Sequence, residues 1–385
     1  MVWITNLFRD YTHVSLHKIL LPGSHDTATY KFDFSIPLKG NKQLFNTVTN
    51  NKILGKILKP ILTRWSQCHT LNFLEQLNIG IRFFDLRVGY LKNKIYFAHS
   101  FATMPMDELI QQIKQFYSQS DIHIKEPIIL KFTYDYYNRH TMYSLDNKKK
   151  FWKKIMELYK YIYSIQNNKI PLLSDIHASG KPVILIVDTP LLKYRDEIVT
   201  ELMNKEEFIY NDKCIIIPNV LTQNSYEGQW HNTFDIKEIS DNVIKEINRI
   251  RTKDSFYNIL GTITPQDTDV TNGIICLVLQ GIGIFFAIIT GIIFAFTYSN
   301  SLIPSIIMFV ITIIICCIWY FQFSCKITPY SLKTNAKKVS NTVLQNIVKH
   351  DNDHRVSIIT SDFTDTDFIN KIIDINKKRI ADTIA

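Results

Sequence analysis

The chain has 385 residues, which suits one large domain with an appendage or two ordinary domains, and 46% of them are hydrophobic, enough for a sizeable core. Its formal net charge of +9 favours an anionic partner, either nucleic acid or an acidic membrane surface. No basic run interleaved with aromatic residues forms a nucleic-acid platform, so we expect a membrane partner and no nucleic acid. The six cysteines lack both a disulfide framework and paired metal-ligand spacing, which indicates reduced thiols in a cytosol-facing protein.

The first motif follows a short apolar run, Ile19–Leu21, which predicts a buried strand. Pro22 and Gly23 are expected to end that strand, and a turn of small residues then presents His25 and Asp26 side by side. A histidine just past a strand end is placed for proton transfer at the rim of a barrel. A His-Asp pair at a turn is also common as a cap or a surface feature, so its meaning depends on the other strand ends.

Residues 31–66 form a long connection before the next predicted helix. Within it, Lys52–Trp65 places apolar side chains on one helical face and basic side chains elsewhere, and Pro60 is expected to kink this helix. A basic amphipathic helix of this kind fits a membrane interface or a core-facing position, and both interpretations stay open.

Apolar strands then alternate with amphipathic helices. Helices are predicted at 67–80, 105–119, 148–166, 193–206, 334–349 and 364–379. After the first strand, further strands are predicted at 81–88, 94–98, 127–134, 182–188, 213–217, 256–263 and 356–363. This alternation indicates an α/β fold, and a set of about eight strands favours a (β/α)8-type TIM barrel over an open doubly wound sheet.

Polar side chains stand at several of the predicted strand ends. Asp85 and Arg87 share one side of their strand because side chains alternate with a period of two, and His99 ends the next strand. Asp362 lies near the end of the last strand. In a barrel whose site lies at the carboxyl ends of its strands, one rim gathers these side chains with His25.

No acidic, basic or histidine side chain occurs from Val270 to Cys325. Two runs within this stretch, Gly273–Thr297 and Leu302–Phe323, are each long enough to cross a hydrocarbon layer of about 30 Å. A short polar turn joins them, so we expect two transmembrane helices in a hairpin, with a buried helical pair as the alternative. Basic residues flank both ends of the hairpin, which places the rest of the chain in the cytosol. Arg9 and Asp10 interrupt the apolar N-terminus, so we expect no signal peptide.

The domain organisation follows from these elements. We expect residues 1–269 to form the first part of a barrel, residues 270–325 to form the inserted hairpin, and residues 326–385 to supply the last helix, strand and helix. Because the hairpin follows the predicted strand 256–263, it lies in a loop after a strand, on the rim that carries His25.

Four motifs, in this order, resemble the phosphatidylinositol-specific phospholipase C (PI-PLC) X-domain family. They are the residues Gly23-Ser24-His25-Asp26, the run Gly-Ile-Arg-Phe-Phe-Asp-Leu-Arg at 80–87, the residues Ala98-His99-Ser100, and the residues Ser361-Asp362-Phe363. The likeness is greatest to bacterial enzymes and to small eukaryotic proteins that consist of an X domain alone. It covers nearly the whole chain apart from the hairpin and part of 31–66, and it implies a distorted TIM barrel.

The resemblance implies a role for each motif residue. His25 acts as the general base on the inositol 2-hydroxyl, and His99 protonates the leaving diacylglycerol oxygen. Asp362 holds the tautomer of His25, Arg87 stabilises negative charge on the phosphoryl oxygens, and Asp26 orients Arg87 or His99. The expected products are diacylglycerol and a cyclic inositol phosphate.

The same resemblance bears on metal dependence. In the calcium-dependent branch of the family an acidic residue stands in the place of Arg87, and another calcium-binding acid is expected at Thr133. Asp26 and Asp85 alone make a poor site for an ion that takes about six to eight oxygen ligands. We therefore expect no metal and no cofactor, with Arg87 as the cation.

The chain departs from the bacterial enzymes, which hold the inositol ring and phosphate with a lysine near Thr133 and an arginine near Val187. Lys131 lies on the same strand face as Thr133 and is either a substitute or a barrel-filling residue. Asp188 either binds ring hydroxyls or caps the following turn, so the substrate-binding candidates are Lys131, Thr133, Asp188 and Asp85. Trp230 lies in a stretch shared with the eukaryotic X-domain-only proteins and has no assigned role.

Three functions follow from these observations. The first is a membrane-anchored phospholipase C that cleaves phosphatidylinositol. The second is a phosphodiesterase that acts on another lipid head group, because the ring-holding residues differ. The third is a catalytically idle membrane scaffold, which the complete set of histidines argues against.

Overall fold

The computed structural model describes most of the predicted α/β part of the chain. The residues described are 1–33, 63–64, 66–91, 93–99, 101–134, 144–167, 169–204, 220–222, 226–229, 231, 233, 235–250, 255–262, 285, 288–289, 291–292 and 332–384. The predicted strand at 213–217, the helix at Lys52–Trp65 apart from residues 63–64, and Trp230 lie outside these residues.

The chain forms two compact units. The first contains Met1–His231, Asp235–Ile263 and Lys333–Ala385, and the second contains Asn232–Phe234 and Thr264–Leu332. The predicted hairpin belongs to the second unit and, apart from a few residues, lies outside the described residues. Among the helices that the structure describes, none combines the length and the apolar character needed to cross a membrane.

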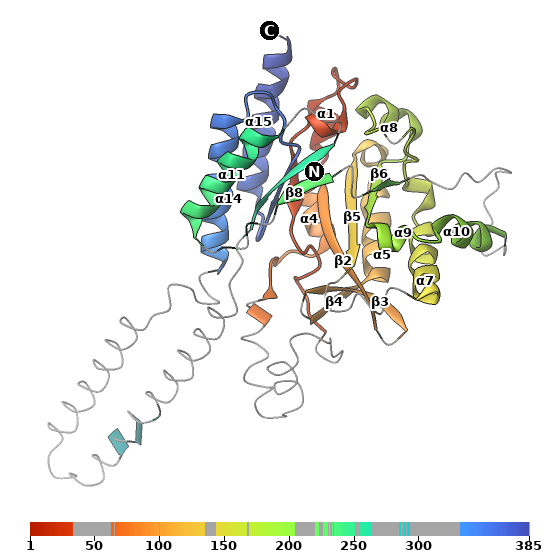
Figure 1. The fold of residues 1–385 in the computed structure, drawn as a ribbon, viewed down its shortest axis with the longest axis horizontal. Coiled ribbons are helices and arrows are strands. Elements are labelled where there is room, and N and C mark those ends of the chain that lie inside the picture. Colours follow the sequence, from red (N-terminus) through yellow and green to blue (C-terminus); the bar gives the residue numbers. More distant parts are fainter. Residues whose placement is uncertain are drawn as a thin grey trace. The chain divides into compact units, whose positions relative to one another are not determined.

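A ten-stranded sheet forms the centre of the first unit (Figure 1). Its parallel strands are β1 (Leu21–Ser24), β2 (Phe83–Leu91), β5 (Ile128–Tyr134), β6 (Val183–Val187), β7 (Leu221–Thr222), β8 (Tyr226–Gln229), β9 (Phe256–Gly261) and β10 (Ile358–Ser361). Their order is β7-β6-β5-β2-β1-β10-β9-β8, so the first strand pairs with the last. Consecutive parallel strands that return to the first strand have the cyclic order of a barrel. Within the described residues, β7 and β8 form no ladder, so the ring is interrupted there.

Two further strands extend β2. Strand β3 (Lys94–His99) runs antiparallel to β2 through a tight connection, and β4 (Phe101–Pro105) runs antiparallel to β3. The hairpin of β2 and β3 brings the chain back toward the end of β2 that carries Arg87, so His99 lies on the same side of the sheet as the motif residues.

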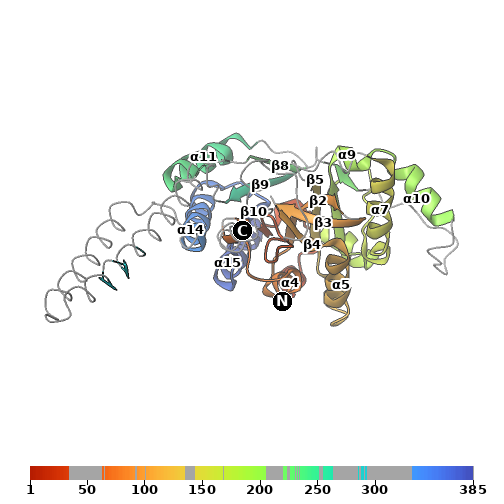
Figure 2. The ribbon, with the colours of Figure 1, turned by 90° about the horizontal axis from the view of Figure 1, so that it is seen from below.

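Helices cover the sheet on both sides (Figure 2). The longer ones are α4 (Phe73–Ile79), α5 (Met106–Tyr117), α7 (Leu145–Met156), α8 (Leu173–Ser179), α10 (Arg195–Asn204), α11 (Ile236–Arg249), α14 (Leu332–His350) and α15 (Thr366–Ile384), and the shorter ones are α1 (Trp3–Leu7) and α9 (Thr189–Leu192). Both views place α11, α14 and α15 beside β8–β10, and α5, α7 and α10 on the opposite side. All five residues of β6 are buried, as expected of a parallel strand with helices on one face and the barrel interior on the other.

Helix α4 shows how the local sequence sets an element that supports the motif strands. The Asn72 side chain accepts a hydrogen bond from the Glu75 backbone, and the Glu75 side chain accepts one from the Asn72 backbone, which completes a capping box. Gly80 ends the helix at φ 118°, a conformation that a residue with a Cβ rarely adopts. This turn leads directly into β2.

A buried ion pair closes the barrel at the amino ends of its strands. Arg82 precedes β2, Glu126 precedes β5, and their side chains meet at 2.8 Å with both fully buried. The Glu126 carboxylate also accepts from the backbone N–H groups of Trp3, Ile4 and Thr5 at 2.9–3.1 Å. These are the first N–H groups of α1 and have no partner within that helix, so Glu126 anchors α1 to the floor of the barrel.

The prediction that Pro22 and Gly23 end the first strand was wrong. Strand β1 begins at Leu21 and continues through both residues to Ser24, in parallel register with β10 from Ile358 to Ser361. A Cβ on Gly23 would lie 2.8 Å from Thr360 Oγ1, so glycine is needed here for close packing of the strands. The pairing with β10, which the local sequence does not reveal, overrides the turn tendency of Pro-Gly.

The other predicted elements that lie within the described residues were correct in type and differ in extent. The helix predicted at 67–80 begins only at Phe73, because residues 66–71 run as an irregular segment beside β1. The helix predicted at 148–166 ends at Met156 and is followed by a 3-10 turn at Tyr159–Tyr161. Strands β4, β7 and β8 and helices α8 and α11 were not predicted.

Candidate active site

The register of β1 and β10 brings two of the motif residues together. Ser24 and Ser361 are paired at the ends of these parallel strands, and the His25 backbone N–H donates to the Ser361 carbonyl at 3.2 Å. The next residues along each strand, His25 and Asp362, therefore leave the barrel side by side. His25 Nδ1 lies 2.9 Å from Asp362 Oδ1, although the two residues are 337 positions apart.

This contact defines the tautomer of His25. A carboxylate only accepts, so Nδ1 carries the hydrogen that Asp362 receives. Nε2 is then the nitrogen available for proton transfer, and it lies 3.0 Å from Arg87 Nη2, which donates to it when the imidazole is neutral. Both side chains of the His25–Asp362 pair are more than nine-tenths buried.

Asp26 is the centre of the cluster. It has φ 43°, a left-handed conformation at the end of β1, and its side chain is 1% exposed. Oδ1 lies 2.7 Å from Arg87 Nε, and Oδ2 lies 2.7 Å from His99 Nδ1 and 3.2 Å from His25 Nε2. Burial alone raises the pKa of Asp26, but Arg87, His99 and His25 together outweigh burial and hold this pKa well below its usual range.

The two histidines face each other across this carboxylate. Their ring centroids lie 6.3 Å apart at an angle of 76°. Burial lowers the pKa of His25, but the charges of Asp26 and Asp362 outweigh it, so the pKa of His25 stays above its ordinary value of 6.5. The His99 side chain is 26% exposed and therefore more open to solvent than His25.

A second charged group lies beside the first, on the facing strands β2 and β5. Their register pairs Asp85 with Lys131 and Arg87 with Thr133. Asp85 Oδ1 lies 3.3 Å from Lys131 Nζ, and Asp85 Oδ2 lies 3.7 Å from Arg87 Nε. Burial opposes the charge on Lys131, but Asp85 outweighs burial and raises the pKa of Lys131. Lys131 is therefore a charged member of the cluster rather than a neutral filler.

Asp188 follows β6 at the same end of the barrel. It stands at the N-cap position of α9 but makes no side-chain capping hydrogen bond, so the structure does not support the alternative in which it caps the turn. Burial raises the pKa of Asp188 to about 6, against the opposing effect of Lys131. A carboxyl group with this pKa sits near its point of ionisation at neutral pH, where it can accept or donate hydrogen bonds.

All the motif residues therefore meet at the carboxyl ends of the parallel strands, and comparison with known proteins identifies the arrangement. No protein-family model matches the chain. Among curated proteins, the chain is 25% identical to PI-PLC X domain-containing protein 3 of Homo sapiens over 276 residues, which are 71% of this chain and 77% of that protein. It is 30% identical over 187 residues to a PI-PLC X-box domain-containing protein of Dictyostelium discoideum, covering 48% of this chain and 23% of that protein. This chain is similar to proteins of the PI-PLC X-domain family.

Solved structures confirm the α/β fold. The chain superposes on a mutant of phosphatidylinositol-specific phospholipase C from Staphylococcus aureus with a TM-score of 0.52 at 14% identity, covering 96% of each chain. A second structure of that enzyme gives a TM-score of 0.52 at 13% identity. At such identity the likeness concerns the fold, and it matches the cyclic strand order seen here.

The donor set of this site does not fit a calcium ion. Ligand atoms of His25, Asp26 and Asp85 lie within 4.8 Å of one another, which is close enough for a metal. However, Arg87 and Lys131 already place fixed positive charges on Asp26 and Asp85, at 2.7 and 3.3 Å. A divalent cation in the same place would be repelled by both and would find too few oxygen ligands.

Sequence reasoning missed two residues of the site. Tyr226 lies on β8, stacks on Phe83 at 5.7 Å, and has the Lys131 ammonium 4.4 Å from its ring centroid. His69 lies in the irregular segment before α4, is 1% exposed, and contacts the backbone of His25. Neither stands at the end of a strand that the sequence pattern revealed, so no local signal marked them.

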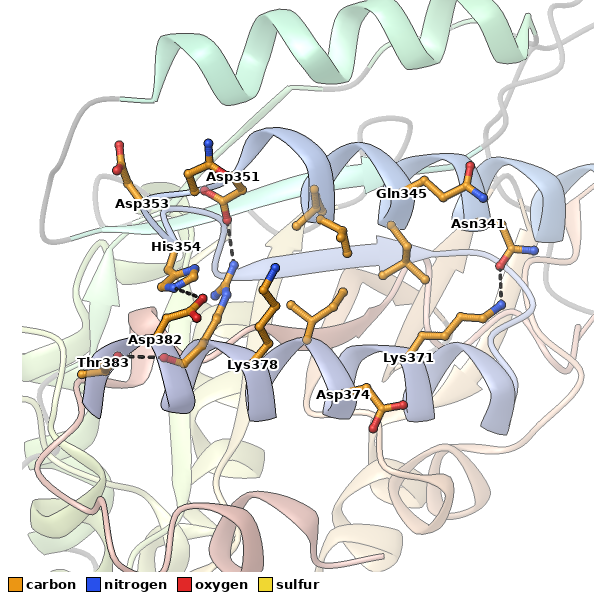
Figure 3. A pocket seen from close by; sticks show the side chains of 16 residues that line it. Asn341, Gln345, Asp351, Asp353, His354, Lys371, Asp374, Lys378, Asp382 and Thr383 are labelled. Carbon is orange, nitrogen blue, oxygen red and sulfur yellow. Dashed lines mark hydrogen bonds and ion pairs between the residues drawn. The ribbon is translucent and has the colours of Figure 1, made fainter. Parts of the chain in front are cut away.

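A cavity of about 1090 Å³ lies elsewhere, between α14 and α15 (Figure 3). No residue of the His25 cluster lines it. Its polar side chains are largely paired with one another, as in the contacts of Lys371 with Asn341 at 2.9 Å and of Arg379 with Asp351 at 2.7 Å. We therefore assign the chemistry to the rim of the barrel and not to this cavity.

Proposed function

We propose that the chain is a phospholipase C-type phosphodiesterase that cleaves phosphatidylinositol to diacylglycerol and a cyclic inositol phosphate. The observation that carries this proposal is the pairing of His25 Nδ1 with Asp362 at 2.9 Å, which leaves Nε2 as a base, with His99 facing it across Asp26. Similarity to that family supports the same reaction class.

His25 is the base of the first half of the reaction. Its Nε2 takes the proton of the inositol 2-hydroxyl while that oxygen forms a bond to phosphorus. In the free enzyme Arg87 Nη2 lies 3.0 Å from this nitrogen. The Arg87 side chain is 32% exposed, so it can move onto the phosphoryl oxygens and leave Nε2 to the substrate hydroxyl. The guanidinium then offsets the charge that develops on those oxygens.

His99 is the acid. Its Nδ1 lies 2.7 Å from Asp26 Oδ2, so we assign the proton to be transferred to Nε2. As the bond from phosphorus to the diacylglycerol oxygen breaks, that oxygen takes the Nε2 proton. The buried carboxylate of Asp26 orients the His99 ring and aligns Arg87 at the same time.

The second charged group supplies the head-group contacts. Lys131 and Asp85 from β5 and β2, with Thr133 and Asp188 at the neighbouring strand ends, border the side of the cluster opposite His99. Ring hydroxyls can donate to the two carboxyl groups and accept from the ammonium. This assignment does not require the lysine and arginine positions of the bacterial enzymes.

Attachment to the bilayer is the remaining part of the proposal. It is supported by the uncharged stretch from Val270 to Cys325 with its two runs of transmembrane length. In the chain, this stretch (270–325) separates the barrel segments 1–269 and 326–385, between β9 and α14. A membrane-held barrel facing the cytosol would meet its lipid substrate at high local concentration.

The test is release of cyclic inositol phosphate from vesicles that contain labelled phosphatidylinositol. We expect activity from the full chain and none above background from His25→Ala. His123→Ala is the matched control, because His123 lies in the 3-10 turn His123–Lys125, away from the cluster, and should keep full activity. Release from other phospholipids, but not from phosphatidylinositol, would assign a different head group, and no release from any lipid would favour a scaffold.

Attachment of the protein to the bilayer is tested separately by deleting residues 273–323. We expect the shortened protein to cleave a water-soluble inositol phosphodiester and to lose activity on vesicles. Unchanged activity on vesicles would contradict attachment through this stretch while leaving the chemistry intact.

A further inference from the structure

The irregular segment before α4 joins the two turns that carry the His25–Asp362 pair. The Cys68 carbonyl accepts a hydrogen bond from the Phe363 backbone at 2.6 Å, next to Asp362. His69 Nε2 lies 2.7 Å from the His25 carbonyl. Two adjacent residues of one segment therefore hold the turn after β10 and the turn after β1.

The contact with His25 sets the role of His69. A carbonyl oxygen only accepts, so His69 Nε2 carries a hydrogen and donates it. The same nitrogen lies 2.9 Å from Ser24 Oγ, whose own hydrogen goes to Gln76 Oε1 at 2.7 Å. Gln76 in turn donates to the Thr27 carbonyl at 3.0 Å. The backbone from Ser24 to Thr27 is thus fixed from behind by side chains that do not face the substrate.

The backbone of both turns needs such support. Asp26 has φ 43° and Phe363 has φ 49°, left-handed conformations that side chains with a Cβ rarely adopt. Strained residues of this kind persist only where the surrounding structure determines them. The Cys68 backbone N–H donates to Thr29 Oγ1 at 3.0 Å, and that hydroxyl donates to the Asp26 carbonyl at 2.7 Å. Each strained residue is therefore tied to the Cys68–His69 segment.

We propose that His69 is a positioning residue, which holds the His25 backbone so that the His25 imidazole stays on Asp362 with Nε2 directed at the substrate. This inference deepens the proposed function and rests on it. His69 is 1% exposed, and its ring contacts Ser24 and the backbone of His25, through which it acts.

His69 itself does not change its protonation state at the pH of the reaction. Burial lowers the pKa of His69 to about 4, so it stays neutral across the range in which His25 titrates. A change in the pH profile of a His69 variant between about pH 5 and 8 therefore reports on His25 and not on His69 itself.

The experiment compares three His69 variants in the full chain, by phosphatidylinositol cleavage and by the pH titration of His25 followed by NMR. His69→Ala and His69→Asn lose the N–H that reaches the His25 carbonyl, whereas the amide of His69→Gln occupies the place of Nε2–H. We expect the first two to lower kcat about tenfold or more with little change in KM, and to move the acid limb and the His25 titration to lower pH by about half a unit. His69→Gln should restore both.

The matched control is Asn376→Ala. Asn376 is fully buried, accepts from the Leu20 backbone N–H at 2.9 Å, and donates to the Leu20 carbonyl at 2.8 Å, at the other end of β1. It should lower the melting temperature without moving the His25 titration. If His69→Ala and His69→Asn titrate like the wild type, or if Asn376→Ala shifts the titration equally, the positioning role is refuted. If the wild-type chain does not cleave phosphatidylinositol, the proposed function is refuted instead. The pH titration of His25 would still decide the role of His69.

Discussion

Replacement of Asp362 by asparagine isolates the charge that supports His25. The amide has the same shape as the carboxylate, and its oxygen can still accept the Nδ1 hydrogen at the 2.9 Å contact. The variant therefore keeps the tautomer and removes the negative charge. A second carboxylate, Asp26, remains on the opposite nitrogen at 3.2 Å.

The expected loss follows from the strength of this contact. A hydrogen bond to a charged group contributes about 1.5–3 kcal/mol, and both side chains are buried, so solvent does not screen it. This contact strengthens as His25 gains its proton in the transition state. Asparagine keeps a neutral hydrogen bond, which contributes about 0.5–1.5 kcal/mol, so the loss is about 1–1.5 kcal/mol. At about 1.36 kcal/mol for each factor of ten, kcat should fall about 5- to 13-fold. The pKa of His25 should fall as well, because Asp362 is one of the groups that raise it.

The assay measures cleavage of a water-soluble inositol phosphodiester from pH 5 to 9, which avoids any effect of vesicle binding. The matched control is Asp365→Asn, three residues further along. Asp365 is 44% exposed, pairs with Lys337, and caps α15 through the Phe368 backbone N–H at 3.0 Å, a role that asparagine also fills. Its activity should equal that of the wild type. An Asp362→Asn enzyme with unchanged kcat and an unchanged acid limb would show that His25 is not the base.

Four further outcomes are expected. His99→Ala should lower kcat about 10²- to 10⁴-fold on a substrate with a poor leaving group and less on an activated aryl ester, which needs no acid; an equal loss on both would contradict its role. The general base must be neutral, and the pKa of His25 lies above 6.5, so kcat/KM should rise with pH through an acid limb above 6.5; a limb below 6 would contradict this. EDTA should leave cleavage unchanged, because the Arg87 guanidinium already pairs with the carboxylate of Asp26. If EDTA abolished activity and calcium restored it, the metal-free assignment would be wrong. Glu126→Ala should lower the free energy of unfolding by about 3–5 kcal/mol in chemical denaturation, since it leaves a fully buried guanidinium unpaired, and a loss below 1 kcal/mol would refute the role of this pair as the barrel floor.

The alternation of strands and helices was readable from the sequence because apolar periodicity is a local property. It located β2, β5, β6 and β10 within a few residues. It failed at β1, where a Pro-Gly pair signals a turn and the pairing with β10 keeps the chain extended. It also missed β7 and β8, which have two and four residues in the structure and are too short for a period to show.

The site divides in the same way. His25, Asp26, Arg87, His99 and Asp362 were identified because each stands in a motif at or near a strand end, and parallel strands that share an edge bring such positions together. The structure places all five within one cluster of contacts. Their catalytic roles remain predictions that the proposed substitutions test.

What the sequence by itself determined is the set of reactive side chains and the edge of the sheet on which they lie, because strand period and chain direction fix both. Only the tertiary structure decided which atoms face each other: that Asp26 is shared by Arg87 and both histidines, and that His69 reaches the backbone of His25 from behind. The contact of His69 with His25 spans 44 positions and that of His25 with Asp362 spans 337, and they depend on the path of an irregular segment and on the register between β1 and β10. Neither has a local pattern, because the partners lie far apart in the sequence and meet only through the pairing of strands and the path of the chain.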